Sequence, residues 1–184
     1  MNMTAFILAG GKSSRMGTDK GLTFFKGEPM IQSIINCLEK LNLPIVIVTQ
    51  NQKYQQFGLP IISDLVKEKG PIGGIHTALT HTTTEKNIIV SCDTPNLDSS
   101  IFKELIDNAN GTITIAKHKN RTHPLIGIYY KKDAIHFTNA LNKNELKLGD
   151  LLNKLSAKSI NFDKKPDKIF RNINTKLELD ENQS

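Results

Sequence analysis

Residues 5–21 read AFILAGGKSSRMGTDKG. A short apolar run is followed at once by glycines, serines, an arginine and two lysines, which predicts a buried strand that enters a polar loop. The loop contains the Gly-Lys-Ser ending of a Walker A motif, but the first glycine of that motif would have to replace Phe6. The dinucleotide fingerprint Gly-x-Gly-x-x-Gly fails as well, because Gly10 and Gly11 are adjacent and the next glycine is Gly17.

The composition of this loop nevertheless predicts a binding site for phosphate groups. Adjacent Gly10 and Gly11 allow positive φ angles and a close approach of the backbone to a ligand, and successive backbone N–H groups form an anion site. Arg15 offers a planar fork of donors, and Lys20 offers a compact charge on a flexible stem. A loop of this length is long enough to wrap a triphosphate.

Strand and helix patterns alternate along the rest of the chain. Apolar, β-branched runs predict strands at 4–8, 45–49, 60–63, 87–93, 112–116 and 125–130. Periodic apolar spacing predicts helices at 29–41, 71–80, 131–142 and 148–155, and another that begins at Ser99 or Ser100. This alternation predicts an α/β fold, namely a single-domain, three-layer, Rossmann-like architecture with a mostly parallel sheet. We expect residues 1–184 to form one domain, with frayed ends at 1–3 and about 180–184.

Two carboxylates follow predicted strands. Asp64 comes after the strand at 60–63, and Asp93 ends the strand at 87–93. Ligands of parallel sheets bind at the carboxyl ends of the strands, and Mg²⁺ is usually held by one or two carboxylates together with substrate phosphates. Either aspartate alone is explained by loop or helix capping, but the pair beside a phosphate-type loop favours a magnesium site.

Composition limits the classes of partner and compartment. The formal net charge is +6, which favours an anionic partner such as nucleic acid, a membrane surface or a phosphorylated small molecule. We expect no nucleic-acid partner, because the densest basic group, KHKNR at 117–121, lacks interleaved aromatic residues. No apolar run has the ~18–20 residues of a membrane span, the N-terminus does not resemble a signal peptide, and the two cysteines form no CxxC motif. These features predict a cytoplasmic protein without a membrane partner.

The segment LAGGKSSRMGTDK, residues 8–20, resembles the loop of the molybdenum cofactor guanylyltransferases. These enzymes belong to a larger group of nucleotidyltransferases that share L-A-x-G-x-S-x-R-M-G-x-x-K. The form Leu-Ala-Gly-Gly, in place of Leu-Ala-Ala-Gly, favours the guanylyl branch over cytidylyl-transferring relatives. The resemblance covers residues 4 to about 179 and includes the segments KGPIGGI (69–75), CDTP (92–95), RTHPLIGIYY (121–130) and FRNINT (170–175).

The resemblance implies a Mg²⁺-dependent enzyme that transfers GMP from GTP to the terminal phosphate of molybdenum-bound molybdopterin and releases diphosphate. It implies that Asp93 is the metal ligand, and that Arg15 and Lys20 act with Asp93 in catalysis. It implies GTP contacts from Leu8, Ala9, Gly10, Gly11, Lys20, Asn51, Asp64 and Asp93. Arg121 and His123 match the family's acceptor side, where the pterin or its phosphate would bind. Proteins that deliver the cofactor or accept the product are further partners consistent with such an enzyme.

Two other functions stay open at this point. One is a cytidylyl- or sugar-phosphate nucleotidyltransferase of the same fold, which base preference would separate from a guanylyltransferase. The other is a non-catalytic module that binds nucleic acid through a basic surface. This second alternative assigns no task to Asp64 and Asp93.

Overall fold

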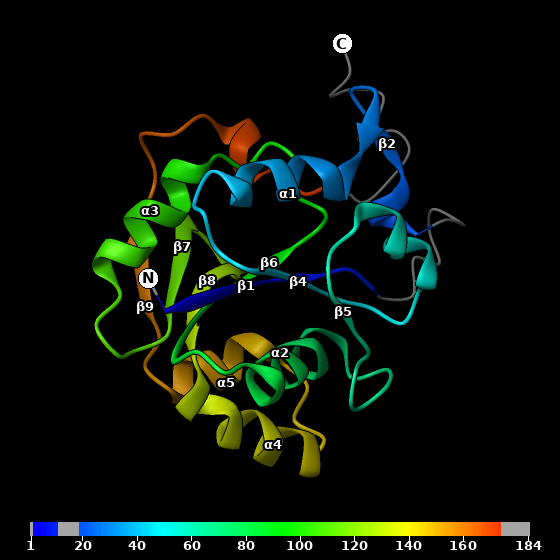
Figure 1. Cartoon of the computed structure of the whole chain (residues 1–184). Coiled ribbons are helices and arrows are strands. Elements are labelled where there is room, and N and C mark those ends of the chain that lie inside the picture. The colour runs from blue at the N-terminus through cyan, green and yellow to red at the C-terminus, as the bar shows by residue number, and fades with distance from the viewer. Residues whose placement is uncertain (1, 11–18, 174–184) are drawn as a thin grey trace.

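A seven-stranded sheet with helices on both faces forms the centre of the molecule (Figure 1). The computed structural model describes residues 2–10 and 19–173. Within these ranges the strand order in the sheet is β5-β4-β1-β6-β8-β7-β9. The strands are β1 (Met3–Leu8), β4 (Ile45–Val48), β5 (Ile61–Ile62), β6 (Lys86–Ser91), β7 (Thr114–His118), β8 (Arg121–Tyr130) and β9 (Lys158–Asn161).

The sheet is mostly parallel, as predicted. Strands β5, β4, β1 and β6 run in one direction, and the first four long strand patterns of the sequence therefore take the order 3-2-1-4. Strand β8 is the exception, because it pairs antiparallel with both β6 and β7. The predicted strands at 112–116 and 125–130 are in fact the two arms of a hairpin, whose turn contains Lys119 with a φ of 53°. The prediction was wrong about their bounds, because the hairpin extends each pairing toward the turn.

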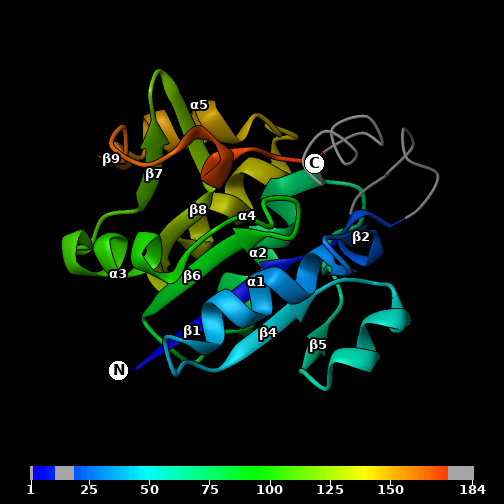
Figure 2. The same cartoon turned by 90° about the horizontal axis from the view of Figure 1, so that it is seen from above.

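Two helical layers cover the two faces of the sheet (Figures 1 and 2). Helices α1 (Met30–Glu39) and α3 (Ser99–Asn108) lie on one face, and α2 (Gly70–His81), α4 (Ala134–Asn142) and α5 (Leu148–Lys154) lie on the other. Successive side chains of a strand point to opposite faces of the sheet, so each central strand contributes to the apolar core on both faces. In β1, Ala5 and Ile7 pack in the core with α1 and α3, whereas Phe6 packs in the core with α2 and α4. A strand buried on both faces has a continuous apolar sequence, which is why it was predicted correctly.

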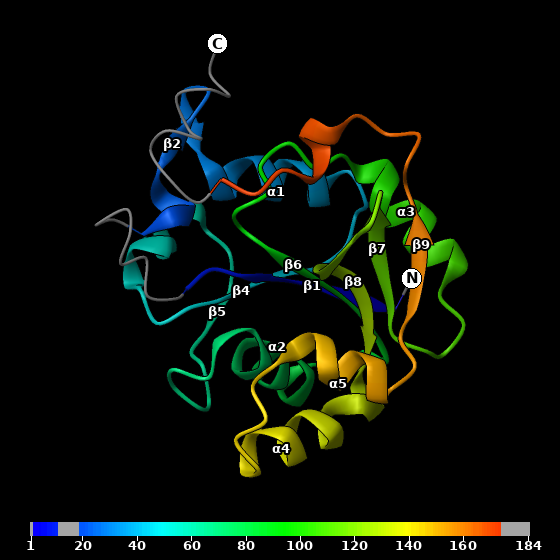
Figure 3. The same cartoon turned by 180° about the vertical axis from the view of Figure 1, so that it is seen from behind.

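Short elements lie beyond the carboxyl end of β1. A 3₁₀ turn, η1 (Lys20–Leu22), leads into a two-stranded ribbon of β2 (Phe24–Phe25) and β3 (Glu28–Pro29). A second 3₁₀ segment, η2 (Gln52–Phe57), follows β4, and Figure 3 shows β2 and the end of β4 on the same side of the molecule. Two more 3₁₀ turns are η3 (Lys131–Asp133), which directly follows β8, and η4 (Asp167–Phe170), which follows β9. Apart from η3, which falls within the predicted helix 131–142, these short elements and β9 were not predicted, because they are too brief to show a periodic pattern.

The helices agree closely with their predicted ranges. Predicted helix 71–80 corresponds to α2, which carries Pro71 in its first turn as expected. Predicted helix 131–142 begins with η3 and continues as α4. Among the described residues no helix is both long and apolar enough to span a membrane.

Candidate active site

The predicted site residues lie just after the carboxyl ends of four neighbouring strands, on one side of the molecule. Asp64 follows β5, Asn51 follows β4, Gly10 follows β1, and Asp93 follows β6. Since neighbouring strands lie ~4.8 Å apart, the two aspartates are separated by three strand spacings, or about 14 Å. This separation is too large for one metal ion to bind both carboxylates, and the ends of β4 and β1 lie between the two strands that carry them. This arrangement agrees with separate roles for Asp64 and Asp93.

The entry to the loop is firmly attached to the sheet. The backbone N–H of Ala9 donates to the carbonyl oxygen of Val48 at 3.0 Å, and the side chain of Ala9 is fully buried. Gly10 does not adopt the positive φ that glycine permits, and among the described residues the nearest atom to a Cβ added there is Thr49 Oγ1, at 4.0 Å. Gly11 and Arg15 lie outside the described residues, so their predicted roles stay predictions.

The exit of the loop is held by Asp19, which precedes Lys20. The carboxylate of Asp19 accepts hydrogen bonds from the amide Nδ2 of Asn51 at 2.9 Å, from the hydroxyl of Tyr54, and from the backbone N–H of Gly21 at 3.2 Å. The side-chain oxygen of Asn51 also accepts from the backbone N–H of Lys53 at 3.0 Å. Asn51 was predicted to contact the nucleotide, and its side chain is here bonded to the loop exit and to η2.

Gly21 brings this loop exit against the strand that carries Asp93. A Cβ added at Gly21 would lie 2.3 Å from the hydroxyl oxygen of Tyr54 and 3.1 Å from the sulfur of Cys92. Tyr54 is fully buried and Cys92 is 6% exposed, so neither side chain has room to move away. Since Cys92 directly precedes Asp93, the η1 turn packs against the residue next to the predicted metal ligand.

Hydrogen bonds hold Asp93 from three directions. The hydroxyl of Ser91 donates to Oδ1 at 2.6 Å, the hydroxyl of Thr94 reaches the same oxygen at 3.5 Å, and the amide of Asn172 donates to Oδ2 at 3.3 Å. The backbone N–H of Ile173 donates to the carbonyl oxygen of Asp93 at 2.8 Å. The sequence assigned no role to Asn172, although the FRNINT segment that contains it was the available signal.

Asp64 has a buried oxygen without a protein partner. Among the described residues, Oδ1 of Asp64 is one of three buried side-chain polar atoms that have no hydrogen-bond partner. Burial raises the pKa of this carboxyl above its usual value. A buried, unpaired acceptor is costly for the fold, and its position at a strand end makes it a candidate contact for a ligand.

The glycines of α2 serve packing onto β1. A Cβ added at Gly74 would lie 3.2 Å from a methyl carbon of Leu8, and one added at Gly73 would lie 3.1 Å from the carbonyl oxygen of Val66. The two glycines of the KGPIGGI segment thus allow the helix to approach neighbouring protein atoms closely. Leu8, a predicted GTP contact, is held in place by this packing.

The acceptor-side candidates lie at the start of β8. Arg121 is exposed, whereas His123 is 7% exposed and its ring lies 5.1 Å from the ring of Phe170. Burial, followed by the charges of Arg121 and His118, lowers the pKa of His123 to about 4. His123 is thus a neutral imidazole at physiological pH, and Arg121 is the charged member of the pair.

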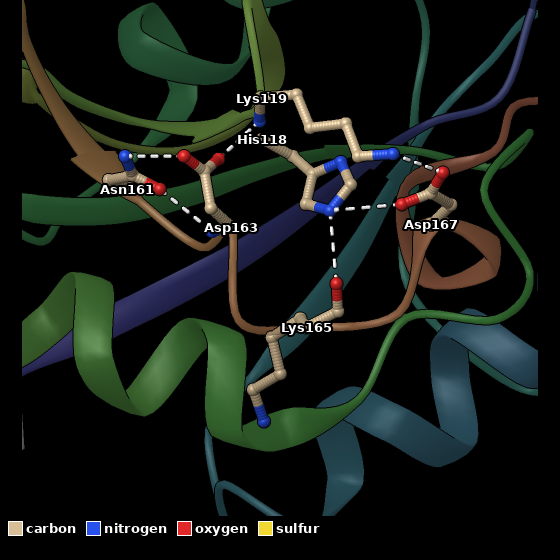
Figure 4. A network of polar contacts seen from close by, with 6 residues as sticks. All are labelled: His118, Lys119, Asn161, Asp163, Lys165 and Asp167. Atoms are coloured by element: carbon tan, nitrogen blue, oxygen red, sulfur yellow. Dashed lines mark hydrogen bonds and ion pairs between the residues drawn. The ribbon is translucent and has the colours of Figure 1, made fainter.

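A network at the tip of the β7–β8 hairpin holds the segment that leads to Asn172 (Figure 4). His118 Nε2 lies 3.0 Å from the carbonyl oxygen of Lys165, and Lys119 Nζ donates to Asp167 at 2.5 Å. Asp163 accepts from the backbone N–H of Lys119 and, at 2.9 Å, from the amide of Asn161. The next turn, η4, carries Phe170, which stacks on His118 at 4.9 Å. These contacts connect the acceptor-side hairpin to the chain that contacts Asp93.

The charged and polar groups fit a cation held jointly with a ligand. The described part of the chain contains no group of three or more His, Cys, Asp and Glu side chains that could hold a metal by themselves. Asp93 offers hard carboxylate oxygens at the loop end of the sheet, and magnesium sites commonly combine one or two carboxylates with substrate phosphates. The donor set is therefore suited to Mg²⁺ in the presence of a nucleotide.

Comparisons with known proteins agree with this geometry. The family of MobA-like NTP transferase domains matches residues 5–158. A protein of Flavobacterium johnsoniae named "Probable molybdenum cofactor guanylyltransferase" is 40% identical over 181 residues, which cover 97% of this chain and 95% of that protein. The molybdenum cofactor guanylyltransferase of Yersinia pestis (strain Pestoides F) is 32% identical, with 97% of this chain and 94% of that protein covered. The solved structure of molybdopterin-guanine dinucleotide biosynthesis protein A from Archaeoglobus fulgidus superposes with a TM-score of 0.81 and 26% identity, covering 98% of this chain and 96% of that one.

Proposed function

Since the chain belongs to the family of MobA-like NTP transferase domains, we propose that it transfers GMP from GTP to the terminal phosphate of molybdenum-bound molybdopterin. The products are the guanine dinucleotide form of the cofactor and diphosphate. The observation that carries this proposal is the packing of Gly21, the residue after Lys20, against Cys92, the residue before Asp93. This packing supports a site in which a cationic side chain and a carboxylate face the same phosphate chain.

The proposed reaction needs little proton transfer from the protein. The nucleophile is a phosphate oxygen that is already anionic at neutral pH, so no strong general base is required. Catalysis then depends on positioning the two substrates and on stabilising the charge that develops as diphosphate leaves. We assign the neutralisation of the β- and γ-phosphates to Arg15 and Lys20, and the +6 net charge of the chain favours the approach of two polyanionic substrates.

Asp93 is the residue proposed to hold Mg²⁺ at the α-phosphate. When bound, the metal supplies charge neutralisation and polarisation of the phosphoryl oxygen. Ser91 and Asn172 support this role, because each bonds one oxygen of the carboxylate and together they fix its orientation. Among the described residues, Oδ2 of Asp93 accepts a bond from Asn172 only, so the carboxylate still has a lone pair for a metal ion.

We assign the guanine base to the part of the site next to β5, where Asp64 lies. Guanine presents N–H donors on its Watson–Crick edge, and the buried Oδ1 of Asp64 is an acceptor without a protein donor. A site arranged around the two neighbouring donors of guanine, N1–H and the N2 amino group, would disfavour cytosine, whose Watson–Crick edge offers a single amino donor. The exposed guanidinium of Arg121 is assigned to the phosphate of the acceptor substrate, at the start of β8.

The two rival functions differ from the proposal in measurable ways. A cytidylyl- or sugar-phosphate nucleotidyltransferase would prefer a different base or acceptor, and the loop motif and the curated relatives favour the guanylyl branch. A nucleic-acid-binding module would bind RNA or DNA with a steep salt dependence and would release no diphosphate.

Isothermal titration of GTP, CTP and ATP in the presence of Mg²⁺ tests the proposal. We expect a clear preference for GTP, and we expect Lys20→Ala to weaken GTP binding about tenfold or more. Lys103→Ala is the matched control, because Lys103 is an exposed lysine on α3, away from the strand ends. Equal binding of the three nucleotides by the unmodified protein would reject the guanylyl assignment.

A further inference from the structure

Asp19 makes more hydrogen bonds than the turn it begins requires. As the N-cap of η1, it needs only the bond from the backbone N–H of Gly21 to its side chain. It accepts two additional bonds, from Asn51 and from Tyr54, which lie 32 and 35 residues further along the chain. These long-range bonds do not form the turn. They attach the turn to the end of β4 and to η2.

The donors of these two bonds are themselves immobile. Tyr54 is fully buried, so its hydroxyl approaches Asp19 from a fixed direction. Asn51 is the N-cap of η2, and its side-chain oxygen is already bonded to the backbone N–H of Lys53, which orients its amide group toward Asp19. Asp19 is thus bound by rigid groups on both carboxylate oxygens.

Lys20 lies between two restrained neighbours. On one side is Asp19 with its three bonds, and on the other is Gly21, whose backbone packs against Tyr54 and Cys92 with no space for a Cβ. The backbone of Lys20 is therefore held through Asp19 and Gly21 against Tyr54 and Cys92. A flexible lysine stem loses less entropy on binding when the backbone from which it extends is already fixed.

We propose that Asp19 is a positioning residue that, through its bonds with Asn51 and Tyr54, holds Lys20 where it meets the triphosphate of the nucleotide. This inference rests on the proposed function and adds a specific task for Asp19, Asn51 and Tyr54. In this arrangement Asp19 itself does not contact the substrate. It also assigns the side chain of Asn51 to loop positioning.

A double-mutant cycle on GTP binding tests the inference. Titrations in Mg²⁺ compare the unmodified protein with Asp19→Asn, Lys20→Ala and the double variant. If Asp19 acts through Lys20, Asp19→Asn weakens GTP binding five- to tenfold, and the double variant binds within twofold of Lys20→Ala alone. GMP lacks the β- and γ-phosphates, so its affinity should change less than twofold in Asp19→Asn.

Two further variants separate positioning from folding. Asp98→Asn is the matched control, because Asp98 caps α3 through a bond from the backbone N–H of Ser100 at 2.7 Å and is exposed. It should leave GTP affinity unchanged. Tyr54→Phe keeps the buried ring and removes one donor to Asp19, and it should weaken GTP binding two- to threefold while GMP binding is retained. This variant tests the inference even where Asp19→Asn folds poorly.

The outcomes distinguish the inference from the function on which it rests. Each of three results would overturn the positioning role. The losses of GTP affinity in Asp19→Asn and Lys20→Ala could multiply in the double variant, or Asp19→Asn could weaken GTP and GMP binding equally. The third result is unchanged GTP affinity in Asp19→Asn and Tyr54→Phe. Failure of the unmodified protein to bind GTP at all would overturn the proposed function itself. If the unmodified protein binds GTP and Lys20→Ala binds it equally well, Lys20 is not the group through which Asp19 acts.

Discussion

Replacing Gly21 by alanine should destabilise the protein strongly, whereas the same replacement at Gly149 should not. The new Cβ at position 21 would lie 2.3 Å from the hydroxyl oxygen of Tyr54, and any shift of that ring would break the bond from Tyr54 to Asp19. Overpacking of this kind costs about 1–3 kcal/mol, and a lost bond to a charged group adds about 1–2 kcal/mol. We therefore expect a loss of about 2–5 kcal/mol in the free energy of unfolding.

Gly149 is the matched control for this substitution. It lies in α5, and a Cβ added there meets no atom within 4 Å. Alanine is a better helix former than glycine by about 0.5–1 kcal/mol, so Gly149→Ala should be neutral or stabilising. The same chemical change is thus expected to have opposite signs at the two positions.

Thermal unfolding followed by circular dichroism measures the difference. For a chain of 184 residues, 1 kcal/mol corresponds to about 2–4 °C in Tm, so Gly21→Ala should melt about 4–20 °C below the unmodified protein. Gly149→Ala should melt at the same temperature or up to about 4 °C higher. If the two variants melt within about 2 °C of each other, which corresponds to at most about 1 kcal/mol, the packing argument at Gly21 is wrong.

Three further substitutions test the proposed site. Asp93→Asn should lower turnover more than tenfold with little change in Tm, because a metal-ion role is worth several kcal/mol, and a variant that keeps over about a tenth of the rate contradicts the metal assignment. His123→Gln should remove a pH dependence of stability: the pKa of His123 is about 4 in the fold and 6.5 when unfolded, so its contribution is complete above pH 6.5 and is lost as the pH falls toward 4. Between pH 8 and pH 5, urea unfolding should show that the free energy of unfolding falls by about 2 kcal/mol more in the unmodified protein than in His123→Gln. Equal decreases in the two proteins would refute the burial argument. Asp64→Asn should raise the free energy of unfolding by on the order of 1 kcal/mol, because it removes a negative charge that burial disfavours, while weakening GTP binding; unchanged GTP affinity would remove Asp64 from the nucleotide site.

The sequence alone predicted the α/β fold, the family and the positions of the main strands. The strands β1, β4 and β6 are buried on both faces, so their apolar runs stand out against the polar loops that follow. Asp93 was placed at a strand end by that same local pattern, and the loop motif at 8–20 identified the family. These features are local in sequence, which is why a single chain was sufficient to recognise them.

Only the tertiary structure decided how distant residues meet at the site. The bonds from Asn51 to Asp19 and from Asn172 to Asp93 join residues 32 and 79 positions apart. The pairing of β8 antiparallel to β6 likewise determines where Arg121 and His123 lie. Periodicity reports whether a side chain is buried, but not which partner it meets, because the partner depends on strand order and register across the whole sheet.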